Sequence, residues 1–198
     1  MQFSGSLTRE QFMFHEMRIT ARLILSGLNE SQILARAVAD NLFQYPTERE
    51  IKSKCRACIK RLVCISDMPV IAEALANGTI FEAKQAALIA MMCQSRLLAE
   101  FMITVIGEKY KKLDLTITRK DMNLFFQRLS EEDETVASWT DATVSKIKSV
   151  IRNCLKETEF ITSTQSEVLL PVTLSESFAE ALTIAGHRDF LPAFNCLD

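Results

Sequence analysis

Helix-forming residues run along almost the whole of this chain, and residues that interrupt helices are scarce. The 198 residues include only five glycines and four prolines. Long segments rich in Ala, Leu, Ile, Glu and Lys repeat their apolar side chains at helical spacing. With 48% hydrophobic residues, the chain can bury a sizeable core without disulfides. The sequence therefore predicts a mainly α-helical bundle with little strand.

The N-terminal segment, MQFSGSLTREQ, lacks the charged and then apolar pattern of a secretory signal. No uncharged run approaches the roughly 18 residues that cross a bilayer as a helix. We therefore expect a cytoplasmic protein without a membrane segment. Its six cysteines are expected to be reduced, because thiols stay free in that compartment.

Residues 29–63 predict a short helix, a tight turn and a strongly basic helix. Asn29 is placed to cap the first helix, and Thr47 with Glu50 has the spacing of a capping box for the second. This order is typical of a helix-turn-helix. We expect it within an N-terminal helical domain of residues 1–113.

The remaining residues, 114–198, predict a second domain of the winged-helix type. One helix is expected after Thr118 and another from Thr140 to about Glu157. The segment that follows, FITSTQSEVLL, places two β-prone pieces around a polar tip, which is the pattern of a small β-hairpin. Two helices followed by a hairpin are the order of a winged helix.

A Cys-x-x-Cys within the basic helix leaves three alternatives: a metal site, a redox site or core packing. On a helical wheel, Cys55 and Cys58 share a side with the apolar residues of that helix. A zinc site needs four ligands, and the only histidines, His15 and His187, stand at opposite ends of the sequence. We predict buried structural thiols and no metal or cofactor.

The stretch TEREIKSKCRACIKRL, residues 47–62, holds six basic residues against two acids. Such charge on a helix after a tight turn suits the neutralisation of nucleic-acid phosphates. An ordinary solvated helix face would carry similar charge, so the pattern alone leaves both interpretations open. The residues that we assign to phosphate contact are Lys52, Lys54, Arg56, Lys60 and Arg61.

The predicted helix from Thr140 offers a second candidate face. Its outer side combines hydroxyl, amide and cationic donors without a carboxylate, which suits contacts to base edges and phosphates. A plain surface helix would look the same, and the polar tip of the expected hairpin carries no cation. The residues assigned to this face are Ser145, Lys146, Ser149, Arg152 and Lys156.

Catalytic motifs are missing from the sequence. It contains no Gly-rich phosphate loop, no nucleophile elbow and no His-Glu-x-x-His. No pair of carboxylates lies in an apolar run that would separate their pKa values. We therefore expect a protein that is not an enzyme and has no small-molecule substrate.

Four strings together resemble the BrxA family, small accessory proteins of the BREX bacteriophage-exclusion systems. They are MRITARLILSGL (17–28), NLFQYPTEREIK (41–52), RLLAEFMITVIGEKY (96–110) and WTDATVSKIKSVI (139–151). The resemblance implies an all-helical protein, in part similar to the antitermination factor NusB, with helix-turn-helix elements. It further implies DNA binding without catalysis, beside the methyltransferase and other BREX proteins, in phage restriction and host-DNA methylation.

Two other functions stay open at this stage. A helical adaptor would dock other BREX components through the same basic helices. The likeness to NusB implies RNA binding as a further alternative. Duplex DNA is the partner that the two basic helices favour.

Overall fold

The computed structural model describes residues 3–9 and 11–196. They form two compact units, one of residues 12–94 and the other of residues 3–9, 11 and 95–196. Residues 12–94 are one continuous segment, so the second unit is built from the segments that precede and follow it in the sequence. The predicted domains, 1–113 and 114–198, divide the chain elsewhere and stay a prediction.

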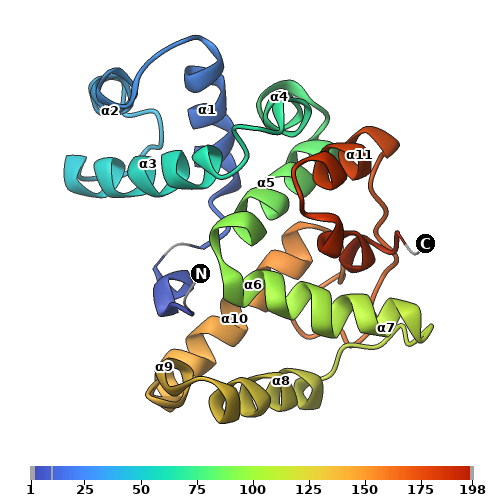
Figure 1. Ribbon diagram of the computed structural model, residues 1–198. Coiled ribbons are helices and arrows are strands. Elements are labelled where there is room, and N and C mark those ends of the chain that lie inside the picture. Colours follow the sequence, from blue (N-terminus) through green and yellow to red (C-terminus); the bar gives the residue numbers. More distant parts are fainter. Residues whose placement is uncertain (1–2, 10, 197–198) are drawn as a thin grey trace. The chain divides into compact units, whose positions relative to one another are not determined.

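The unit of residues 12–94 consists of helices around an apolar core (Figure 1). Helix α1 packs against α3 and α4, α2 packs against α3, and α4 packs against α5. Helix α5 is the central element, because nearly all of its residues from Ala83 to Cys93 are buried. The helices are α1 (Phe14–Leu25), α2 (Glu30–Ala39), α3 (Glu48–Val63), α4 (Pro69–Asn77) and α5 (Ile80–Gln94).

Local capping determines where α2 and α3 begin, as the sequence predicts. The Asn29 side chain accepts from the Gln32 amide at 3.0 Å, and Gln32 accepts from the Asn29 amide in return. Thr47 Oγ1 accepts from the Glu50 amide at 3.2 Å. These bonds satisfy amides that the first turn of a helix leaves without a backbone partner.

Two arginines of α1 donate hydrogen bonds to carbonyl groups at the C-terminal end of α4. The Nε atom of Arg22 donates to the carbonyl of Ala76 at 2.8 Å, and Arg18 Nη2 donates to the carbonyl of Gly78 at 2.7 Å. The last carbonyls of a helix have no partner within the helix and carry partial negative charge. These arginines therefore join α1 to α4.

The second unit is also helical, and short segments complete it. Helices α6, η2 and α7 follow one another without a break, and η2 is π-helical. The 3-10 segment η1 packs on α10, while η3 packs against η2 and α11. Its elements are η1 (Gly5–Thr8), α6 (Arg96–Phe101), η2 (Met102–Gly107), α7 (Glu108–Lys111), α8 (Arg119–Glu132), α9 (Glu134–Ala137), α10 (Asp141–Glu157), α11 (Glu176–Ile184) and η3 (Arg188–Phe194).

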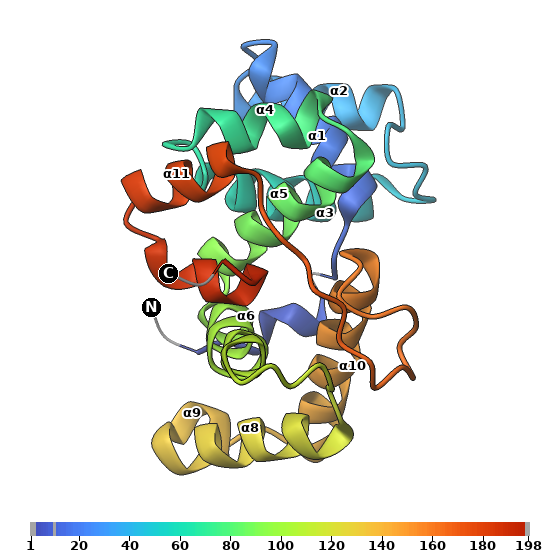
Figure 2. The ribbon, with the colours of Figure 1, turned by 90° about the vertical axis from the view of Figure 1, so that its right-hand side faces the viewer.

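The predicted winged helix with its β-hairpin is wrong, because the segment after α10 forms no hairpin. Figure 2 draws this segment as an irregular loop between α10 and α11, without arrows. Within the described residues, β pairing is limited to an isolated antiparallel bridge between Thr116 and Val168. The adjacent Ile117 amide donates to the Glu167 carbonyl at 2.8 Å. The all-α class is confirmed.

The reason for this difference lies in the partners of the two β-prone pieces. The second piece pairs with Thr116, in the segment just before α8, and not with the first piece. In the first piece, Phe160 and Ile161 are buried in the core of the unit. A bond from the Leu170 amide to the Phe160 carbonyl joins the pieces at 2.8 Å, but it does not extend into a ladder. The apolar pattern therefore reflects burial rather than a hairpin.

Candidate nucleic-acid interface

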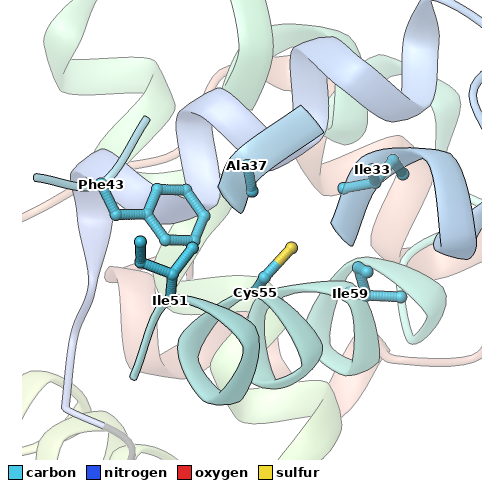
Figure 3. Packing of buried hydrophobic residues seen from close by; sticks show 6 residues of the cluster. All are labelled: Ile33, Ala37, Phe43, Ile51, Cys55 and Ile59. Carbon is cyan, nitrogen blue, oxygen red and sulfur yellow. The ribbon is translucent and has the colours of Figure 1, made fainter. Parts of the chain in front are cut away.

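An apolar cluster between α2 and α3 determines which way the basic side chains of α3 point. Figure 3 shows the Cys55 sulfur on the α2 side of α3, with Ile51 and Ile59 beside it along the helix. Because α2 covers this side, the charged face of α3 turns away from it. The buried members of the cluster are Ile33, Ala37, Phe43, Ile51, Cys55 and Ile59.

Both cysteines of the Cys-x-x-Cys are buried free thiols, which confirms the prediction of core packing. Burial raises the pKa of Cys55 to about 11 and that of Cys58 to about 12. The neutral thiol is therefore the stable form at neutral pH. In the part of the chain that the structure describes, no group of His, Cys, Asp and Glu side chains could hold a metal ion.

Four cations of α3 form one stripe, defined here as Arg49, Lys52, Arg56 and Lys60. Their spacing of three, four and four residues aligns them along the helix. All but Lys52 are exposed; Lys52 is half-buried and donates to Glu48 at 2.9 Å. The sequence analysis missed Arg49, although its spacing of seven from Arg56 is a signal that it shares that face. The half-buried Lys54 lies outside the stripe.

Arg61 was assigned to the same contact, but its side chain is fully buried. Its Nη1 donates to the carbonyl of Phe12 at 3.2 Å, and its Nε donates to Gln94 Oε1 at 3.2 Å. Phe12 and Gln94 are the first and last residues of this unit. Arg61 therefore joins the entry and exit of the chain, and it takes no part in the stripe.

The five residues assigned to α10 occupy two different surroundings. Lys146 and Lys156 are exposed to solvent. Ser145, Ser149 and Arg152 line a cleft with a volume of about 560 Å³, and of these three only Arg152 is half-buried. The cleft lies among α8, α10 and the loop after α10, and its other lining residues are Arg119, Met122, Asn123, Lys148, Asn153, Thr164, Gln165 and Glu167.

Arg152 forms one wall of this cleft by holding the loop. Its Nε donates to the carbonyl of Thr164 at 2.6 Å, and its Nη2 donates to the carbonyl of Ser166. Burial lowers the pKa of Arg152, while the charge of Glu167 opposes that shift. Since its donors meet loop carbonyls, Arg152 positions the loop.

Lys148 is a cation of the cleft that the sequence analysis missed. Its Nζ donates to Asn123 Oδ1 at 2.7 Å and lies 5.3 Å from the centre of the Phe126 ring. Burial is the main cause of the lowered pKa of Lys148. On the helical wheel of α10, Lys148 lies next to the inward-facing residues. Its contacts are therefore set by the neighbouring α8, which supplies Asn123 and Phe126.

Among the described helices, none is by itself both long and apolar enough to cross a membrane. Two consecutive segments, Ile80–Gln94 and Arg96–Lys111, meet that criterion only when taken together, and they are bent at the break between them.

A crystal structure of an uncharacterized protein from Magnetospirillum magneticum matches all of this chain with a TM-score of 0.84 and 20% identity, and the match covers all of that chain. At that identity the two share the fold.

Three relatives carry the name BREX protein BrxA. The one from Bacillus cereus is 29% identical over 80% of this chain and 78% of its own length. The one from Paramagnetospirillum magneticum is 24% identical over 81% and 79%, and the one from Escherichia coli is 22% identical over 94% and 87%. The BrxA family model matches residues 1–185, and the chain therefore belongs to the BrxA family.

Proposed function

We propose that this chain is a non-catalytic DNA-binding component of a BREX phage-defence system, with the stripe on α3 as its duplex contact. Membership of the BrxA family and three relatives named BREX protein BrxA support the defence role. The observation that supports the DNA contact is the stripe itself. It gathers positive charge locally on a chain whose net charge is −2.

The dimensions of the stripe suit a phosphate backbone. From Arg49 to Lys60 the helix rises about 16 Å, at roughly 1.5 Å per residue. Several phosphates fall within that length, since a duplex carries one about every 1.7 Å along its axis when both strands are counted. Glu48 pairs with Lys52 and so lowers the positive charge at the N-terminal end of the stripe. Arg56 and Lys60 therefore contribute most of its positive charge.

A salt titration of the full chain tests this proposal. Fluorescence anisotropy would follow binding to a labelled DNA duplex, to one of its single strands and to an RNA duplex of the same sequence. Neutralising four phosphates predicts that the logarithm of the affinity falls against log salt with a slope of about −3 to −4. A slope near zero would contradict a phosphate contact.

The two alternatives give different results in the same experiment. An RNA-binding protein would hold the RNA more tightly than the DNA duplex at every salt concentration. An adaptor would bind none of the three nucleic acids and would form a complex with another purified BREX protein. In the second case the stripe would meet an acidic protein surface.

A further inference from the structure

The cleft among α8, α10 and the loop after α10 has no part in the proposed contact of α3. Its volume of about 560 Å³ falls within the range of roughly 300–1,000 Å³ that is typical of small-ligand pockets. A DNA duplex is a convex cylinder, so its phosphates would meet the rim of such a hollow rather than its walls. The shape indicates a ligand of smaller size.

The charge that lines the cleft is mainly positive. Arg119 comes from the first turn of α8, and Lys148 and Arg152 come from α10. Glu167 is the one carboxylate among the lining residues. Its charge acts on Arg152, which already holds the loop. Arg119 and Lys148 therefore remain as the cations available to an anionic group.

The surroundings of Lys148 are the strongest indication that the cleft binds an anionic group. It is half-buried and its ammonium group has three donors, one of which goes to the neutral Asn123. Burial disfavours the charged form of Lys148, the charge of Asp141 offsets part of that cost, and an anion in the cleft would offset more of it. Arginine and lysine side chains both bind phosphate groups in proteins, arginine through paired donors and lysine as a point charge.

Neutral groups occupy the rest of the lining and indicate what else the ligand carries. The hydroxyl of Ser149 donates to the carbonyl of Ser145, so its oxygen can still accept. The amides of Asn153 and Gln165 can donate and accept, and Met122 adds an apolar contact. A bare phosphate would accept from the two amides but leave their oxygens and Met122 unused, whereas a ligand that also carries hydroxyls and ring nitrogens would use them.

We propose that this cleft binds a small phosphorylated ligand of nucleotide size. Arg119 and Lys148 meet its phosphate, and the serine and amide side chains meet its neutral part. Arg152 is a positioning residue that holds the wall formed by the loop. The sequence offers no motif for such a ligand because the cleft is made by residues from α8, α10 and the loop together.

Isothermal titration calorimetry on the full chain tests the proposal, with adenosine monophosphate, inorganic phosphate and adenosine as probes. We expect saturable binding of the nucleotide with a Kd below about 1 mM, and binding about tenfold weaker or worse for each of its two parts. The double variant Arg119→Gln/Lys148→Met should weaken nucleotide binding by about tenfold or more, because it removes both phosphate contacts.

The matched control is the double variant Lys120→Gln/Lys156→Met. It removes the same charges from the same two helices, at exposed residues outside the lining of the cleft. Its nucleotide affinity should stay within about twofold of the parent. Melting curves check folding, and Arg119→Gln alone, at an exposed residue, serves as the test variant if Lys148→Met lowers the melting temperature.

Three results would overturn the proposal. The first is a lack of saturable binding up to about 10 mM nucleotide. The second is an equal loss of binding in the matched control, which would show general charge attraction. The third is displacement of the nucleotide by duplex DNA while the α3 stripe is intact, which would make the cleft part of a duplex-binding surface. Duplex binding by α3 is measured separately, so the two proposals fail independently.

Discussion

Helices α3 and α10 carry similar patterns of basic residues, but the fold uses them differently. On α3 the neighbouring α2 covers only the apolar side, and Arg56 and Lys60 reach solvent. On α10, helix α8 and the following loop approach the polar side, and Lys148 and Arg152 are drawn into contacts with them. Basic residues on a helix are thus accessible to a partner only where no other segment of the chain approaches them.

The largest expected effect is on duplex DNA binding by α3. Changing Lys52, Arg56 and Lys60 to Glu reverses three charges of the stripe and should lower affinity by about a hundredfold or more at moderate salt. Changing Lys146 and Lys156 to Glu should lower it by less than about tenfold, because these lysines flank the cleft without forming a stripe.

Fluorescence anisotropy measures both affinities, and circular dichroism confirms that both variants are folded. The inward Ile51 and Ile147 remain in place in the respective variants, so their helices should form. A larger loss of duplex affinity in the α10 variant than in the α3 variant would show that α10 is the principal duplex contact.

The second prediction separates two arginines of α3. Replacing Arg61 with Met should reduce the free energy of unfolding by about 2–4 kcal/mol, since the buried carbonyl of Phe12 and the half-buried side chain of Gln94 each lose a hydrogen bond from Arg61. Replacing the exposed Arg56 with Met is the matched control and should change it by less than about 0.5 kcal/mol. Denaturant titration measures both, and equal effects would refute the structural role of Arg61.

The third prediction concerns the loop that Arg152 holds. Arg152→Met should cost about 1–2 kcal/mol of stability and speed amide hydrogen exchange in residues 163–167, because the carbonyls of Thr164 and Ser166 lose their donor. Lys156→Met, four residues along α10, should leave that exchange unchanged. Unchanged exchange in the Arg152 variant would mean that other contacts hold the loop.

The smallest effect is expected from the thiols of α3. The ordinary thiol pKa is 9.0, and burial raises that of Cys58 to about 12, so the folded state favours the neutral form. The stability contributed is complete below pH 9 and is lost as pH rises toward 12. Denaturant midpoints between pH 8 and 11 should therefore fall, and they should fall less in Cys58→Ala.

That substitution also has a packing cost of about 1 kcal/mol at pH 7, because it leaves a small cavity. Labelling gives an independent check: iodoacetamide at pH 8 should modify the half-buried Cys64 before Cys55 and Cys58. Labelling of Cys58 at the rate of Cys64 in the native protein would show that the core of this unit opens readily.

The helices themselves could be predicted because their signals are local. Thr47, Thr118 and Thr140 each accept a bond from the amide three residues ahead, so the start of a helix can be read from adjacent residues. The start of α1 at Phe14 is an exception, because no side chain caps it. Met13 has a φ of 47°, a left-handed conformation that a helix does not contain.

The sequence by itself determined the helical class, most helix starts and the inward direction of Cys55 and Cys58, because these depend on spacing within one helix. Only the tertiary structure decided that Val168 pairs with Thr116, that Arg61 is buried, and that a cleft forms beside Lys148. The physical reason is that hydrogen-bond partners and burial come from segments far apart in the chain. No local pattern specifies which of them will meet.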